Sequence, residues 1–201
     1  VVPSPVALPF VSASPTPVFL NTFTASATFA VDDETGAVLW DVSSTVARPL
    51  ASITKLMSAL VLSELPVPWQ ATTTITEADS DGSNTHLKVG ETYTLKTLWQ
   101  VALVGSSNTA VSALVRMSGI PESEFVVRMN AKAMRLKMTS LHFVEPTGLD
   151  PRNVGTARDV ARLLALTWAT QHDHPGGARI DKILSVHEIF EHLKREAEAA
   201  E

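Results

Sequence analysis

Apolar and polar positions follow a strand pattern near the start of the chain and a helical pattern after it. Residues 28–31 and 37–42 are rich in β-branched and aromatic side chains, and the polar residues 32–36 between them are typical of a turn, so we expect a β-hairpin. From Ser52 onward, apolar side chains recur at helical spacing, at Ile53, Leu56, Met57, Leu60 and Val61. This pattern predicts a helix that buries one face, with Pro49 at its entry.

Three further helices are predicted after it. Thr94 is placed to cap the first of them, Gly119 ends the second, and Pro121 starts the third. The inward side chains are expected to be Leu95, Leu98, Trp99, Ala102 and Leu103 in the first helix, Ala110, Ala113, Leu114 and Met117 in the second, and Phe125, Met129 and Met134 in the third. Methionines at such spacing are typical of core packing.

A last helix opens at Thr156, which can form a capping box with Asp159. Its inward side chains are expected to be Val160, Leu163, Leu164 and Trp168. The threonine-rich segment 71–77 predicts a strand. The acidic segment 79–84 predicts a solvated loop, because it lacks the glutamate that ends a calcium-binding loop.

Length and composition narrow the class of protein. The chain has 201 residues, of which 45% are hydrophobic, enough for one domain with a sizeable core. Its net charge of −5 argues against a nucleic-acid partner, and the absence of cysteine excludes disulfides and thiolate metal sites. No apolar run is long enough to span a membrane, and no signal peptide is visible at Val1.

Composition also divides the chain. Residues 1–22 are rich in proline and predict an extended segment, residues 23–190 form the folded domain, and the charged residues 191–201 predict a solvated helical tail. Histidines occur at 172 and 174, with an aspartate between them, and at 187 and 192. We expect no metal site there, because loop histidines rarely bind a specific ion and the last two are five residues apart.

The candidate chemistry starts with Ser52 and Lys55, which lie three residues apart and therefore on the same helix face. A serine hydroxyl becomes nucleophilic when a neighbour takes its proton, and a lysine removed from water can do so. The helix N-terminus also offers N–H groups to a developing oxyanion. A Ser-x-x-Lys pair alone is a weak signal, since an ordinary amphipathic helix matches it by chance.

The second candidate group lies about fifty residues later. Residues 105–108, Gly-Ser-Ser-Asn, interrupt two helical stretches, so Ser106 and Asn108 are expected in a tight turn. Serine and asparagine are common in turns for local reasons. A functional interpretation makes Ser106 a proton relay and Asn108 a hydrogen-bonding partner for substrate.

Ser-x-x-Lys followed by Ser-x-Asn is the pattern of serine penicillin-binding proteins and class A β-lactamases. The segment 51–57, Ala-Ser-Ile-Thr-Lys-Leu-Met, resembles the nucleophile segment of the low-molecular-mass D-alanyl-D-alanine carboxypeptidases, the S11 serine peptidases. Residues 87–91, 143–150 and 156–161 are similar to three further segments of that family, in the same order. The resemblance extends from about Phe29 to Ile189.

The resemblance implies a fold and a reaction. The fold would be α+β of the β-lactamase/transpeptidase type, with a helical subdomain packed on an antiparallel sheet and the active site between them. Ser52 would attack the D-Ala-D-Ala peptide bond of a peptidoglycan stem peptide and form an acyl-enzyme, with Lys55 as base. Ser106 would relay a proton to the leaving amine, and Asn108 would bind the substrate amide. No cofactor is implied, β-lactams would be covalent inhibitors, and the location would be extracytoplasmic.

The sequence departs from the family pattern in two places. No Lys-Thr-Gly motif occurs after the second motif, so we expect an incomplete sheet and at most slow acylation by this chain alone. An incomplete sheet would leave Thr28–Val31 with an exposed edge, which predicts self-association. Glu145 stands where the family usually has Asn, and as a plain loop residue it would pair with a nearby Arg or Lys.

Two alternatives to a carboxypeptidase stay open. A class A-like β-lactamase needs a carboxylate that activates the deacylating water, and Glu145 is its candidate. A non-catalytic domain that binds peptidoglycan would not need the missing motif.

Overall fold

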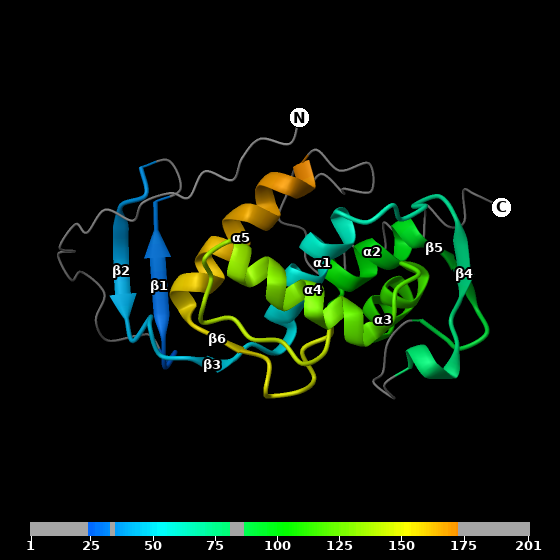
Figure 1. Cartoon of the computed structure of the whole chain (residues 1–201), viewed down its shortest axis with the longest axis horizontal. Helices are drawn as coiled ribbons and strands as arrows, with labels where there is room; N and C mark the ends of the chain where they lie inside the picture. Colours follow the sequence, from blue (N-terminus) through cyan, green and yellow to red (C-terminus); the bar gives the residue numbers. More distant parts are fainter. Residues whose placement is uncertain (1–23, 33–34, 81–86, 173–201) are drawn as a thin grey trace.

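The computed structural model describes residues 24–32, 35–80 and 87–172. Helices form the centre of an elongated molecule, with a β-hairpin at each end (Figure 1). The proline-rich segment 1–22, the tail 191–201 and the histidines at 174, 187 and 192 lie outside the described residues. The division of the chain into these three parts therefore stays a prediction.

The first hairpin is confirmed. Strands β1 (Thr28–Val31) and β2 (Val38–Val42) pair antiparallel, with Thr28 opposite Val42. Arg158 docks this hairpin on the helices, since its guanidinium lies 5.3 Å from the centre of the Phe29 ring and donates a 2.7 Å hydrogen bond to Asp41. The described pairing of β1 is to β2, and self-association through its other edge stays a prediction.

Helix α1 (Thr54–Ser63) is the centre of the fold. It is packed against α2, α3, α4 and α5, so it is buried around most of its circumference and not on one face as expected. Its start also differs from the prediction. Pro49 lies in strand β3 (Arg48–Pro49), which pairs with β6 (Val154–Gly155), and a 3₁₀ turn η1 (Ala51–Ile53) leads into the helix.

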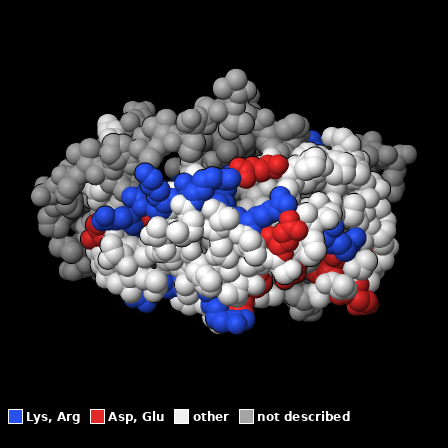
Figure 2. Space-filling model, in the orientation of Figure 1, with Lys and Arg blue, Asp and Glu red and all other residues white. Residues whose placement is uncertain are grey.

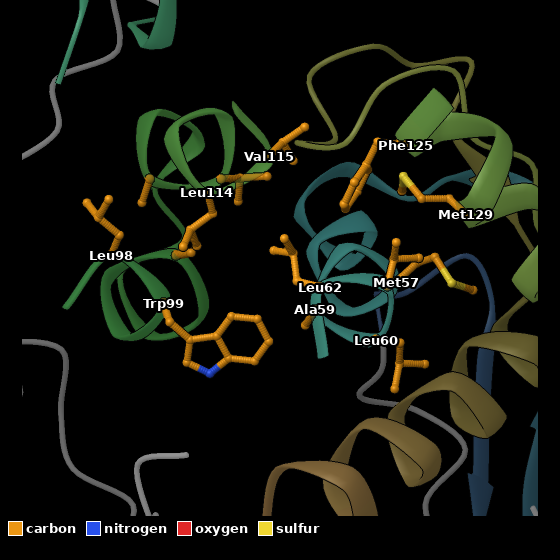
Figure 3. Packing of buried hydrophobic residues seen from close by; sticks show 14 of the residues in the cluster. Met57, Ala59, Leu60, Leu62, Leu98, Trp99, Leu114, Val115, Phe125 and Met129 are labelled. Atoms are coloured by element: carbon orange, nitrogen blue, oxygen red, sulfur yellow. The ribbon is translucent and has the colours of Figure 1, made fainter. Parts of the chain in front are cut away.

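The next two predicted helices are α2 (Leu95–Val104) and α3 (Asn108–Met117). Thr94 caps α2 as expected, accepting a 3.0 Å hydrogen bond from the Thr97 N–H. Helix α4 (Glu122–Arg135) follows Gly119 and Pro121. Figure 3 shows how α1 joins two parts of one core, with Leu62 and Trp99 on one side and Met57, Phe125 and Met129 on the other.

Three of the expected core residues are exposed. Ile53 in η1 is 40% exposed, Met134 on α4 is 64% exposed and Leu164 on α5 (Ala157–His172) is 52% exposed. Only half of the predicted capping box of α5 forms. The Asp159 N–H donates to the Thr156 hydroxyl, but the Asp159 carboxylate binds Ser140 and Arg162.

The second hairpin joins β4 (Thr72–Thr74) to β5 (Thr92–Thr94), and the sequence predicted only the first of these strands. A 3₁₀ turn η2 (Glu77–Asp79) follows β4. Asp79 is 3% exposed and bonded to Arg116 of α3, so the prediction of a solvated loop is wrong at this residue. Residues 81–84 lie outside the described part.

The architecture is α+β, with a helical body and, among the described residues, three separate two-stranded antiparallel sheets. Figure 2 shows positive and negative side chains next to one another over the middle of one face. Glu64, directly after α1, forms ion pairs with Lys132 and Arg135 of α4. In the described residues, no helix is long and apolar enough to cross a bilayer.

Candidate active site

Ser52 lies in η1, and Lys55 lies in the first turn of α1 that follows it. The Lys55 ammonium Nζ is 2.9 Å from the Ser52 hydroxyl oxygen, so the two side chains are hydrogen-bonded as the three-residue spacing predicts. Ser52 is exposed, whereas Lys55 is 3% exposed. The pair therefore presents a hydroxyl to solvent and keeps the amine behind it.

A second hydrogen bond fixes the Lys55 side chain. Its Nζ donates to the backbone carbonyl oxygen of Thr147 at 2.8 Å. Lys55 also borders a cavity of about 10 Å³ between α1, α2 and α3, together with Ser58 and apolar side chains that include Trp99, Leu103 and Leu114. The amine is thus held between two oxygens, with mostly apolar surroundings beside its stem.

The backbone is strained at two positions of the predicted site. Ala51, directly before Ser52, has φ +47°, and Ser106 has φ +56°. Residues with a Cβ adopt this region at a cost of order 1–3 kcal/mol, and such strain clusters at functional sites. Ala51 is the first residue of η1, so the strained position directly precedes the exposed Ser52.

Ser106 lies in the turn between α2 and α3, as predicted. Asn108 does not lie in this turn but is the first residue of α3, because Ser107 caps the helix one residue earlier than expected. Ser106 is exposed, and Ser107 caps α3 by accepting a 3.2 Å hydrogen bond from the Ala110 N–H. Both helices pack against α1, so the turn belongs to the same helical body as Lys55. The relay role of Ser106 and the substrate-binding role of Asn108 stay predictions.

Glu145 is built into the turn that carries Thr147. Its carboxylate accepts hydrogen bonds from the Thr147 N–H and hydroxyl, both at 2.6 Å, and from the Gly148 N–H at 2.5 Å. The Asn153 side-chain amide adds a bond of 2.7 Å. The expected pairing of Glu145 with an Arg or Lys is therefore wrong, because backbone amides and an asparagine take both of its oxygens.

The sequence missed the residues that support this turn. Ser58, one helical turn after Lys55, donates a 2.7 Å hydrogen bond to the Pro146 carbonyl. Asn153 is 0% exposed and also accepts from the Val144 N–H and donates to the Glu145 carbonyl. One feature of the sequence could have indicated the role of Ser58, because it is a polar residue inside the apolar run of α1.

No group of His, Asp or Glu side chains in residues 24–32, 35–80 and 87–172 is arranged to hold a metal ion. The chemistry that this arrangement offers is that of a hydroxyl nucleophile beside an amine.

Comparison with known proteins agrees with the geometry. The family model of the S11 peptidases, D-alanyl-D-alanine carboxypeptidase, matches residues 12–192. A D-alanyl-D-alanine endopeptidase of Pseudomonas aeruginosa is 37% identical over 161 residues, which cover 77% of this chain and 52% of the relative. The D-alanyl-D-alanine carboxypeptidase DacB2 of Mycobacterium tuberculosis is 34% identical, over 69% of this chain and 48% of the relative.

A solved structure shares the fold. The D-alanyl-D-alanine carboxypeptidase from Mycobacterium tuberculosis H37Rv superposes with a TM-score of 0.71 at 31% identity, covering 84% of this chain and 62% of that one. The chain spans about half the length of the curated relatives it matches. By the family match and the shared fold, the chain belongs to the D-alanyl-D-alanine carboxypeptidase family of S11 serine peptidases.

Proposed function

We propose that this chain carries the nucleophile of a serine peptidase that acts on D-Ala-D-Ala peptides of peptidoglycan, with release of the terminal D-alanine. The observation that carries the proposal is the 2.9 Å contact between the buried Lys55 amine and the exposed Ser52 hydroxyl. In this reaction Lys55 removes the proton as Ser52 Oγ attacks the carbonyl carbon. Ser106 then passes a proton to the departing amine, and Asn108 holds the substrate amide. Water hydrolyses the acyl-enzyme.

The Thr147 carbonyl supports the role of Lys55. An amine that bonds to both Ser52 and a fixed carbonyl has a defined direction, so its nitrogen is held where the serine proton must go. A catalytic role also accounts for a lysine placed inside the helical body, where few lysines lie. The corresponding location is extracytoplasmic, where peptidoglycan is found, and β-lactams would acylate the same serine.

A second candidate differs only in the leaving group. The Pseudomonas aeruginosa relative is named an endopeptidase, which favours cleavage of a D-alanyl bond inside a cross-linked peptide. Both reactions use the same acyl-enzyme. Release of D-alanine from a linear pentapeptide indicates a carboxypeptidase, and conversion of a cross-linked muropeptide dimer to monomers indicates an endopeptidase.

The β-lactamase alternative has less support. Both oxygens of Glu145 are engaged in its own turn, so this carboxylate is not directed at a deacylating water. Steady turnover of a chromogenic cephalosporin would favour the lactamase, and a single burst favours the peptidase. A domain that only binds peptidoglycan would give neither.

The direct test is covalent labelling by a fluorescent penicillin, followed by intact mass. Ser52→Ala should abolish labelling, and Lys55→Ala should slow it by several orders of magnitude while the protein stays folded. Ser63→Ala, at the end of the same helix, and Lys88→Ala, an exposed lysine, serve as matched controls that should label like wild type. Labelling that survives Ser52→Ala would overturn the proposal.

A further inference from the structure

The turn 145–150 lies against the Lys55 amine and against the backbone of Ala51 and Ser52. The Thr147 carbonyl accepts from Lys55 Nζ at 2.8 Å. Gly148, the next residue, has φ +95°, and a Cβ built there would lie 1.9 Å from the Ala51 carbonyl oxygen and 3.0 Å from the Ser52 nitrogen. The position of this turn therefore bears on the Lys55 amine and on the backbone that leads into Ser52.

The turn gives its own backbone donors to one side chain. The N–H groups of Thr147, Gly148 and Asp150 point at the Glu145 carboxylate, at 2.6, 2.5 and 3.4 Å. Such a concave set of amides is a site for an anion, and here the anion belongs to the chain itself. Hydrogen bonds to a charged acceptor are about twice as strong as neutral ones.

Two residues tie the turn to the helical body. Asn153 donates to the Glu145 carboxylate at 2.7 Å and to the Thr54 hydroxyl of α1 at 3.2 Å. Ser58 of α1 donates to the Pro146 carbonyl at 2.7 Å. Glu145 thus accepts both from the amides of its own turn and from Asn153, which links it to α1. Ser58 holds the same turn to α1 through a separate hydrogen bond.

We propose that Glu145 is a positioning residue that holds the Thr147 carbonyl against Lys55 and so fixes the direction of the amine toward Ser52. An asparagine at this position would offer a single uncharged acceptor oxygen and could not take the same set of donors. The carboxylate makes this turn more firmly held than an asparagine would. The consequence for acylation rests on the proposed function, but the ordering of Lys55 does not.

The first test reads the structure directly. In protein labelled at lysine, the two Cε protons of a held side chain give separate resonances, and those of a mobile side chain merge. Glu145→Ala should merge the Lys55 pair and increase amide exchange at Thr147 and Gly148 by about tenfold to a hundredfold, since hydrogen bonds to a charged group are lost. Glu124→Ala, which removes an exposed carboxylate of α4, should change neither.

Conservative variants separate positioning from folding. Glu145→Gln and Glu145→Asn should give intermediate effects. The Lys55 side chain should be most ordered in wild type, less ordered in these two variants and least ordered in Glu145→Ala. If Glu145→Ala does not fold, these two variants and Ser58→Ala carry the test. Separate Lys55 resonances in every folded Glu145 variant would overturn the proposal.

The second test measures penicillin acylation at saturating and at low concentration. A positioning role predicts a lower limiting acylation rate with an unchanged half-saturation concentration. If the Lys55 side chain loses order in the Glu145 variants but the acylation rate does not change, the effect on acylation is refuted. The role of Glu145 in ordering Lys55 would still stand. Absence of labelling in wild type, even after prolonged exposure to saturating penicillin, would refute the proposed function, while the resonance test would still decide the role of Glu145.

Discussion

Gly148 lies against Ala51 so closely that the space of a methyl group at position 148 is already filled by the Ala51 carbonyl, 1.9 Å from an ideal Cβ. The contact joins the turn after α4 to the strained residue that precedes Ser52. Both partners are held by other contacts, because Ala51 begins η1 and the Gly148 N–H donates to the Glu145 carboxylate. This close approach of the two backbone segments therefore requires glycine at position 148, because any Cβ there would overlap the Ala51 carbonyl.

Gly148→Ala is expected to destabilise the protein by more than about 2 kcal/mol, because it combines a positive φ with a backbone clash. Gly119→Ala is the matched control. Gly119 has φ +79° but no atom within 4 Å of an added Cβ, so it should lose only about 1 kcal/mol. Urea denaturation measures both values, and equal losses would show that the contact with Ala51 yields at little cost.

The sequence predicted the helices well because their signals are local. Apolar spacing and the residues Thr94, Gly119 and Pro121 mark helices whose caps the structure confirms at Thr94 and Gly119. Strands β3 and β6 were missed, since each has two residues and pairs across about a hundred positions of sequence. Met134 and Leu164 were misplaced because helical spacing gives a face but does not say how wide the buried stripe is.

The candidate site also contains features that the sequence could predict and features that it could not. Ser52 and Lys55 could be paired from sequence, since one helical turn separates them. The Thr147 carbonyl could not be, because every residue has a carbonyl and this one lies 92 positions from Lys55. Glu145 was noticed as a departure from the family, but its partners are backbone amides that no residue type reveals.

Asp79→Asn should destabilise the protein by about 2 kcal/mol, because it breaks a mostly buried ion pair that joins the second hairpin to α3. Asp79 accepts from Arg116 at 2.9 and 2.8 Å and from the Thr76 N–H at 2.8 Å. The estimate is below that for a fully buried pair, because the Arg116 side chain is 37% exposed. Glu124→Gln, which breaks an exposed pair on α4, should cost less than about 0.5 kcal/mol.

The same pair predicts how stability depends on pH. Burial raises the pKa of Asp79, but hydrogen bonds from Arg116 and Thr76 outweigh burial and hold the pKa below 3.8. Because the folded-state pKa is depressed, this stabilisation is present above the unfolded-state pKa and is lost as pH falls through the folded-state pKa. Between about pH 5 and pH 2, wild type should lose more stability than Asp79→Asn. Parallel curves for the two proteins would contradict this prediction.

Asn153→Asp should give the opposite pH dependence. Asn153 is fully buried and its amide nitrogen lies 2.7 Å from the Glu145 carboxylate, so an aspartate there places two carboxyl groups in contact. Like charges raise the pKa of one of the two, so the variant should be strongly destabilised at neutral pH and recover as pH falls. Asn153→Ala removes the same hydrogen bonds without adding a charge. Denaturation at two pH values should therefore show acid recovery only in the aspartate variant.

Tyr93 is the single tyrosine of the chain, so the near-ultraviolet absorbance of its phenolate reports one group. Burial, and then the hydrogen bond that its hydroxyl donates to Glu91, raise the pKa of Tyr93 to about 12 from an ordinary 10.0. The raised pKa means that this contribution to stability is complete below about pH 10 and is lost as pH rises through about 12.

Glu91→Gln should lower the Tyr93 midpoint part of the way toward 10, because burial, the larger cause, remains. Glu77→Gln is the control, because it removes an exposed carboxylate in η2, between β4 and β5. It should leave the Tyr93 midpoint unchanged. Tyrosine absorbance in urea gives the unfolded reference in the same sample. A wild-type midpoint near 10 in the folded protein would contradict this prediction and show that the Tyr93 hydroxyl is hydrated and not bonded to Glu91.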